Sequence, residues 1–321
     1  MVEPELSLKS SDALRFIQMA GIFYGLSELT EPWGLELPPM DSSVWFHAVT
    51  SGECAIDVDG ACETLTAGDF VLVPHGGGHR AWGRSRSPTV PVFDLDNDYV
   101  NDQYAVLRYG GGGALTTIVC GCIRFGDHPA VRRLFSALPP LIQIDQAQTA
   151  GSGWLQPTLR MLAEETRTVR PGSDAVISRL CDIVVMQSIR HWIEGTDAAQ
   201  TGWLKALRDP RIGRVIAQIH ANPARAWSVA SLAAEAGLSR SAFSARFTNL
   251  VGEPAMRYVT LCQMHHAAHL LQDAQTSIAQ VAATLGYESE AAFNRAFKRV
   301  TGDTPRGNAR RQSGRLLDGR K

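Results

Sequence analysis

Residues 229–258 read VASLAAEAGLSRSAFSARFTNLVGEPAMRY, and residues 278–307 read IAQVAATLGYESEAAFNRAFKRVTGDTPRG. A glycine, two phenylalanines spaced four residues apart, a second glycine and a proline recur in the same order in both stretches. Such self-similarity indicates an internal repeat of about 50 residues. This repeat is the strongest organisational signal in the chain.

Each copy of the repeat predicts a helix, a turn at Gly237 or Gly286, and a second helix. The glycine permits the positive-φ turn that ends the first helix. Because the phenylalanines are four residues apart, both rings lie on one face of the second helix, which buries that face and exposes the other. A helix–turn–helix unit has this form, and the exposed face of its second helix can enter a DNA major groove.

Charge divides the chain near residue 205. Residues 1–204 hold 14 Lys and Arg against 24 Asp and Glu, a net charge of −10, whereas residues 205–321 hold 17 against 8, a net charge of +9. This asymmetry predicts two domains with different partners. A basic segment of this size indicates a polyanion as its partner, although a basic, solvated surface gives the same signal.

The residues before about 127 predict strands. Short alternating or β-branched runs are separated by glycine, aspartate and proline, as in an all-β barrel or sandwich: VWFHAVTSG (44–52), ACETLTAGDFVLVPHGGGHRAW (61–82) and ALTTIVCGCIRF (114–125). Residues 84–113 predict a surface loop with at most one short element. From residue 127 the period becomes helical, and two amphipathic helices are expected from Trp154 to about Thr168 and from Ser173 to about Glu194.

Composition excludes several classes of protein. The chain is 45% hydrophobic and 20% charged, so it is not a disordered or collagen-like chain. No apolar run reaches the roughly 20 residues that span a bilayer, and the N-terminus lacks the pattern of a signal peptide. We therefore expect a cytoplasmic protein with no membrane partner, in which the six cysteines are thiols, metal ligands or redox sensors rather than disulfides.

At residues 208–311 the chain resembles the AraC/XylS-type transcriptional regulators. The resemblance is carried by WSVASLAAEAGLSRSAFSARFTNLVGEPAMRYVT, by the helix LCQMHHAAHLL that follows it, and by SIAQVAATLGYESEAAFNRAFKRVTGDTP. The N-terminal part is similar to the cupin-type sensor domains of one branch of that family, through HAVTSG, LTAGDFVLVPHGGGH, IVCGCIRF and RLFSALPPLI. The resemblance implies a sensor domain controlling a DNA-binding domain that acts as a homodimer on promoter DNA and often activates RNA polymerase.

These observations predict an α+β multidomain protein with four segments. The expected order is a cupin-like β-barrel sensor (1–145), a helical linker and dimerisation segment (146–204), a tandem helix–turn–helix domain (205–311) and a polar tail (312–321).

Seven residues are the expected DNA contacts. The resemblance places Arg240, Ser241 and Ser244 on the first recognition helix and Glu290, Asn294 and Arg295 on the second. Arg pairs bidentately with guanine, Asn with adenine, and Glu accepts a hydrogen bond from cytosine N4. Where the family commonly has Arg after Ser244 this chain has Ala245, and Arg246 is turned about 100° around the helix, toward phosphate rather than a base edge.

Four residues are the expected ligands of a zinc ion in the barrel. GDFVLVPHGGGH resembles the second cupin motif, whose last histidine is His79 here, while His47 stands alone where the first motif has His-x-His. Cys120 and Cys122 are two residues apart, so both lie on the same strand face and are able to meet the histidines. Two imidazoles with one or two thiolates suit Zn²⁺, whereas core histidines and inert buried thiols are the alternative.

The sequence therefore predicts a sequence-specific DNA-binding regulator, an activator rather than an enzyme. Its sensor is expected to respond to a redox, metal or small-molecule signal: oxidation releases a zinc-bound thiolate, and barrel interiors hold organic effectors. The alternative is a metal-dependent cupin enzyme fused to a DNA-binding module. Such an enzyme needs an open coordination position and usually a carboxylate ligand, and Glu53 is the nearest candidate.

Overall fold

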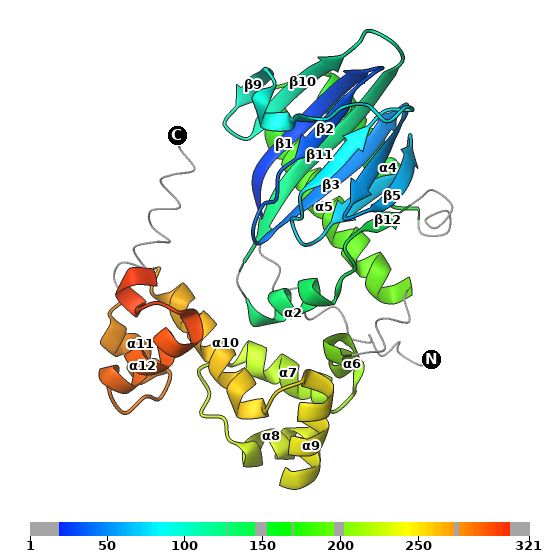
Figure 1. Ribbon diagram of the computed structural model, residues 1–321. Coiled ribbons are helices and arrows are strands. Elements are labelled where there is room, and N and C mark those ends of the chain that lie inside the picture. Colours follow the sequence, from blue (N-terminus) through cyan, green and yellow to red (C-terminus); the bar gives the residue numbers. More distant parts are fainter. Residues whose placement is uncertain are drawn as a thin grey trace. The chain divides into compact units, whose positions relative to one another are not determined.

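The computed structural model describes residues 19–126, 128–144, 153–168, 170–195, 202–272 and 276–308 (Figure 1). The described residues form two compact units. One takes residues from 17–126 and 135–195, and the other takes residues from 127–134 and 196–321. The boundary crosses helix α2 (Pro129–Ala137), so the second unit is discontinuous in sequence. The predicted tail, 312–321, lies outside the described residues.

The first unit is built on two β-sheets. The larger sheet has the strand order β12-β6-β3-β11-β1-β10-β9, and the smaller has the order β5-β4-β7-β2-β8. The strands are β1 (Met19–Thr30), β2 (Gly34–Leu37), β3 (Ser43–Ser51), β4 (Glu53–Val58), β5 (Ala61–Thr66), β6 (Phe70–Val73), β7 (His79–Trp82), β8 (Val90–Pro91), β9 (Asn97–Asn101), β10 (Tyr104–Gly110), β11 (Leu115–Phe125) and β12 (Ile142–Ile144). A short 3-10 helix, η1 (Val92–Asp94), follows β8.

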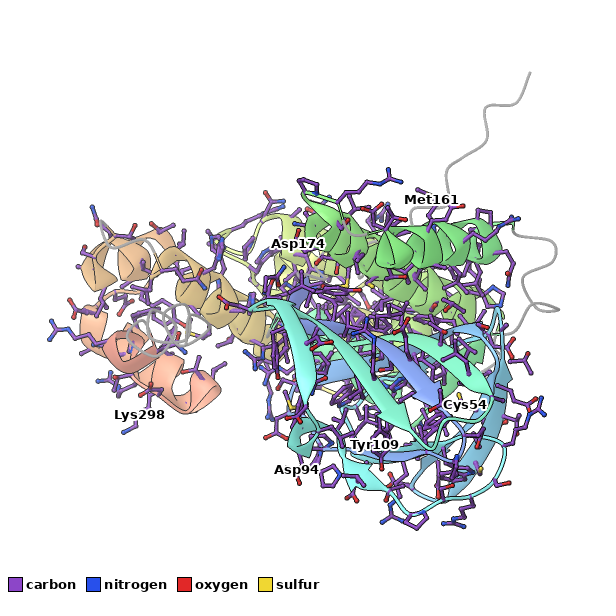
Figure 2. All side chains as sticks on the ribbon, turned by 90° about the horizontal axis from the view of Figure 1, so that it is seen from above. Cys54, Asp94, Tyr109, Met161, Asp174 and Lys298 are labelled. Atoms are coloured by element: carbon purple, nitrogen blue, oxygen red, sulfur yellow. The ribbon has the colours of Figure 1, made fainter. Side chains whose placement is uncertain are left out.

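One face of the larger sheet belongs to the core of this unit. Trp45 and Val49 of β3 and Ile118 and Cys122 of β11 are buried in that core, as the period of two residues per face requires. On the other face, helices α4 (Leu155–Arg167) and α5 (Ser173–Gly195) contact the sheet, and Figure 2 shows them side by side there. The two amphipathic helices expected from the sequence are thus confirmed.

The expectation for residues 84–113 is wrong. They hold β8, η1, β9 and β10 rather than a loop with at most one short element. Strand β10 pairs in parallel with β1, with Tyr24 beside Tyr104 and Thr30 beside Gly110. A parallel partner about 80 residues earlier leaves no local pattern in the sequence, whereas hairpin partners do.

The second unit holds two helix–turn–helix repeats, as expected. Its helices are α6 (Gly202–Arg208), α7 (Ile212–Ala221), α8 (Val229–Ala236), α9 (Arg240–Val251), α10 (Ala255–Leu270), α11 (Ile278–Thr284) and α12 (Glu290–Thr301). The turns contain Gly237 at φ +62° and Gly286 at φ +74°, the left-handed conformation that favours glycine. Ser239 and Ser289 begin the second helix of each repeat by accepting hydrogen bonds from the amides of Ala242 and Ala292.

The phenylalanine pairs hold each repeat together. Phe243 and Phe247 of α9 and Phe293 and Phe297 of α12 are fully buried, with ring centroids 5.5 and 5.6 Å apart within the pairs. Burying one such ring stabilises a fold by about 2–3 kcal/mol. The opposite faces of α9 and α12 therefore stay available to solvent.

No helix in the described part of the chain is both long enough and apolar enough to cross a membrane.

Candidate nucleic-acid interface and sensor cavity

Helix α9 exposes the face that the sequence assigned to DNA. Arg240, Ser241 and Ser244 are exposed, and so is Ala245. This surface carries one long cationic side chain, at the first residue of the helix, followed by small groups. Its chemistry suits contacts with phosphate and with the thymine methyl group rather than bidentate hydrogen bonds to guanine.

Arg246 on the same helix is already engaged within its own unit. Its guanidinium donates two hydrogen bonds to Asp209, from Nε at 3.1 Å and from Nη2. The other carboxylate oxygen of Asp209 accepts from the amides of Arg211 and Ile212, at 3.0 and 2.9 Å. Burial acts to raise the pKa of Asp209, but these hydrogen bonds outweigh it and lower the pKa. Arg246 thus ties α9 to the turn before α7, and its phosphate contact stays a prediction.

Helix α12 presents a different set of groups. Glu290 and Arg295 are exposed, as a base-reading role requires. Asn294 is half-buried, and its Oδ1 is buried with no hydrogen-bond partner among the described residues. An acceptor enclosed in this way is less accessible to a base than the exposed side chains of Glu290 and Arg295. All three stay predicted DNA contacts.

Two exposed cations on α12 were missed by the sequence reasoning. Lys298 and Arg299 lie in the last turn of the helix, and Figure 2 shows Lys298 at its surface. The signal that would have found them is the run of basic residues after Phe297, on the face opposite the phenylalanines. Together with Arg295 they give α12 more positive charge than α9 presents, and phosphate contacts need such charge.

Residues that follow β11 reinforce the first repeat. Arg133 of α2 donates to the carbonyl of Val251, at 3.0 Å, and to the carboxylate of Glu253. Its guanidinium also lies 5.5 Å from the ring centre of Tyr258. Arg133 therefore bridges the end of α9 and the start of α10 within the helical unit.

In the β-sheet unit, His47 and His79 lie together as expected. Their Nε2 atoms are 2.8 Å apart. His79 Nδ1 donates to the carbonyl of Gly77 at 3.0 Å, so its Nε2 carries the lone pair and accepts from His47 Nε2–H. Burial lowers the pKa of His79 to about 4 and that of His47 well below its usual value. The pair is therefore neutral at neutral pH.

The two cysteines do not join the histidines. Cys120 Sγ lies 3.8 Å from the Ser27 hydroxyl, and Cys122 Sγ donates to the Ser43 hydroxyl at 3.2 Å. In the described part of the chain, no group of three or more His, Cys, Asp or Glu is arranged to hold a metal ion. Two zinc-bound nitrogens are about 3.3 Å apart in a tetrahedral site, which is wider than the His47–His79 pair.

The geometry thus brings together two of the four expected zinc ligands, and a four-ligand site does not fit the arrangement. The hydrogen bond from His79 Nδ1 to a backbone carbonyl is typical of metal-bound histidine, but it serves a metal-free pair equally well. Zinc therefore stays a prediction of the sequence alone.

Burial makes three cysteines of this unit poor nucleophiles, while Cys62 on β5 is exposed. Burial raises the pKa of both Cys120 and Cys122 to about 11, and that of Cys54 to about 12. A thiol with such a pKa is protonated at neutral pH, and the protonated form is a poor nucleophile. The chemistry of these three residues suits packing rather than oxidation sensing.

A cavity of about 230 Å³ opens in the wall of the same unit. It lies along β1 and β10, under η1 and β9, and Cys120 and Ser27 are in its lining. Most of this wall comes from the segment that the sequence reasoning took for a loop. A cavity of this size in a β-sheet unit is able to enclose a small organic molecule.

The fold defines a class of protein: a β-sheet unit joined to a helical unit that carries two helix–turn–helix repeats. Residues 11–194 match the Cupin family and residues 232–311 match a helix-turn-helix domain family. The chain is 33% identical to a putative AraC-like transcription regulator of Streptomyces lividans, over 82% of this chain and 85% of that protein. The chain belongs to the AraC-like family of transcriptional regulators, and its helical unit binds DNA.

Other relatives of this chain also have the names of transcriptional regulators. The regulator AlkR of Acinetobacter baylyi is 29% identical over 85% of this chain and 90% of its own length. RclR of Escherichia coli, named as an RCS-specific transcriptional activator, is 29% identical over 82% of this chain and 83% of its own length. The DNA-binding domain of AdpA in complex with a target DNA matches 33% of this chain and 95% of that chain, with 27% identity and a TM-score of 0.31. The curated relatives are named as regulators, not as enzymes.

Proposed function

We propose that this regulator activates transcription from promoters that its two recognition helices bind, in response to a small molecule held in its cupin-like unit. The observation that carries the proposal is the cavity beside Cys120, in a unit where the four expected zinc ligands do not come together and the thiols of Cys120 and Cys122 are buried. The activating role is supported by relatives whose names describe activation, RclR and the F1 operon positive regulatory protein of Yersinia pestis.

DNA recognition is tested first, without any effector. Binding sites are selected from random DNA with the purified chain, and the selected site is footprinted. We expect the wild-type chain to protect a defined site. In Arg295→Ala, the discrimination against a wrong base at one position of that site should fall by about 5- to 150-fold, because a bidentate Arg–guanine pair contributes about 1–3 kcal/mol. Unchanged selectivity in that variant contradicts base reading by Arg295. Arg240→Ala serves as the comparison, because it is expected to weaken binding to all sequences alike.

Activation is tested by transcription in vitro from a promoter that carries the selected site. Purified RNA polymerase, the expected partner, is added with and without the regulator. A rise in transcript that depends on the site supports an activator, and a fall identifies a repressor.

A homodimer is expected to be the active form. Met161 on α4 and Val176 and Ile183 on α5 are large apolar side chains that are 54, 44 and 48% exposed. Val176 and Ile183 are seven residues apart, two turns of one helix, and therefore share a face. Ile183→Glu is expected to shift the sedimentation of the chain from dimer to monomer, while Arg160→Glu on α4 leaves it unchanged. A dimer that survives Ile183→Glu contradicts this interface.

Metal and oxidant inputs are tested on the same protein. Untagged chain purified under reducing conditions is analysed for metal, and so is His79→Ala. About one zinc per chain that falls in the variant would replace the small-molecule input by a metal input. Loss of DNA binding after mild peroxide treatment, reversed by thiol reductant, would favour an oxidant instead.

A further inference from the structure

We infer that the cavity along β1 and β10 takes an uncharged aromatic molecule of one or two rings that carries a single hydroxyl or carbonyl group. This inference rests on the proposed function, because it names the class of effector for the same sensor unit.

The cavity lining is almost free of charge. Asp102 is the one charged residue among those that line it, and it is exposed in the turn between β9 and β10. Deeper in the core, the His47–His79 pair is neutral. Moving an ionised group from water into such surroundings costs several kcal/mol without a partner. The cavity therefore favours a neutral ligand.

Aromatic rings lie in and beside the cavity lining. Phe23 lies edge-on to Phe93, with ring centroids 5.6 Å apart, and edge-on to Trp45, at 5.2 Å. Phe93 and Tyr99 line the cavity while 53 and 71% of their surface is exposed. Large apolar side chains left exposed at the rim of a cavity gain burial when a ligand arrives. Aromatic pairs in edge-on or offset geometry gain energy beyond that burial, which favours a ring in the ligand.

The volume of the cavity sets the size of the ligand. An engineered apolar cavity of about 150 Å³ binds benzene. At about 230 Å³, this cavity has room for a second fused ring or for a short substituent on one ring. A molecule much larger than naphthalene would extend out of this volume toward solvent.

Ser27 places a buried hydroxyl in the lining of the cavity. Ser27 is 5% exposed and lines the cavity. Its hydroxyl lies within hydrogen-bond distance of the Cys120 thiol, with Oγ and Sγ 3.8 Å apart. A thiol is a weak hydrogen-bonding group, so the hydroxyl keeps capacity for a better partner. The amides of Asn97 and Gln103, also in the lining, donate to the carbonyls of Leu95 and Gly21. A polar group on the ligand is therefore expected to bind at Ser27. Tyr104, whose buried hydroxyl has no hydrogen-bond partner among the described residues, also lines the cavity.

Three probes separate these features in titration calorimetry on the full chain: 2-naphthol, naphthalene and 2-naphthoate. We expect 2-naphthol to bind once per chain and 2-naphthoate to bind at least tenfold more weakly. Ser27→Ala is expected to weaken 2-naphthol about three- to tenfold and to leave naphthalene unchanged, as loss of one hydrogen bond predicts. Thr64→Ala, an exposed hydroxyl on β5, is the matched control and is expected to change neither.

A filling variant checks the location. Ala105 lines the cavity beside Gly25 of β1, and Ala105→Phe is expected to abolish binding of both neutral probes while DNA binding stays intact. Naphthol binding that survives Ala105→Phe, equal binding of naphthoate, or tighter binding of 1-decanol than of 2-naphthol would overturn the inference. So would the absence of binding by both neutral probes at their solubility limits. Failure of the selected DNA site to bind the free chain would instead refute the proposed function.

Discussion

The contrast between Arg246 and Lys298 makes a quantitative prediction about binding to DNA. Arg246 is occupied by Asp209, whereas Lys298 is exposed on α12 and forms no ion pair with the described residues. Salt weakens protein–DNA complexes in proportion to the number of phosphates that the protein neutralises, because those contacts release counterions. Lys298→Ala should therefore flatten the salt dependence of binding, and Arg246→Ala should not.

The magnitude follows from the exposed cations on α9 and α12. Four have no ion pair with the described residues: Arg240, Arg295, Lys298 and Arg299. If each neutralises one phosphate, each bound chain contributes about −3.6 to the slope of log K against log salt, which is a fall in affinity of about 150-fold per chain from 50 to 200 mM salt. Lys298→Ala reduces the slope to about −2.7 and the fall to about 40-fold. Were Arg246 also a phosphate contact, the wild-type fall would be about 500-fold.

The assay is fluorescence anisotropy with a labelled selected site at several salt concentrations. Arg246→Ala is expected to lower affinity by the same factor at each concentration, because it loosens α9 without removing a phosphate contact. A slope that becomes shallower by about 0.9 in Arg246→Ala would refute the reasoning. An unchanged slope in Lys298→Ala would remove that residue from the interface.

Three further outcomes concern stability. Phe293→Ala is expected to lower the unfolding free energy of the helical unit by about 3–5 kcal/mol, because the ring is fully buried, and urea unfolding followed by circular dichroism measures this loss. Gly252→Ala should lower the unfolding free energy by about 1 kcal/mol in the same assay, because Gly252 has φ +83° and only the backbone strain counts where a Cβ meets open space. An unchanged unfolding free energy would show that the backbone relaxes to a negative φ. The folded state holds the pKa of His79 at about 4, whereas the pKa in an unfolded chain is near 6.5. The unfolded chain therefore binds the proton more readily, and the unfolding free energy should fall as the pH drops from 6.5 toward 4. The loss is at most about 1.4 kcal/mol per pH unit. Thermal unfolding of His79→Gln should depend less on pH over that interval than wild type does.

The helical unit was accessible to sequence reasoning because its signals are local. Gly237 and Gly286 mark turns, and the phenylalanine pairs mark buried faces, within a few residues of the helices they define. The partner of Arg246 was not accessible. Asp209 lies 37 residues away, and only the packed unit shows that the two side chains meet.

In the β-sheet unit, less of the site could be predicted from the sequence. The pairing of His47 with His79 followed from strand alternation and a motif. Cys120 and Cys122 share a strand face as expected. Their thiols lie beside the hydroxyls of Ser27 and Ser43 rather than beside the histidines, and the sequence does not show this. The cavity was missed because its wall depends on the parallel pairing of β1 with β10, which has no sequence signature.

The discontinuity of the helical unit limits how freely it can be exchanged between proteins. A chimera that grafts only residues 196–321 onto a foreign sensor leaves 127–134 behind. The carboxylate of Glu253 and the carbonyl of Val251 then lose the guanidinium of Arg133, and His220 loses the ring of His128, 5.0 Å away. A joint placed before residue 127 fails as well, because residues 135–195 belong to the β-sheet unit, so no single recombination joint leaves both units whole.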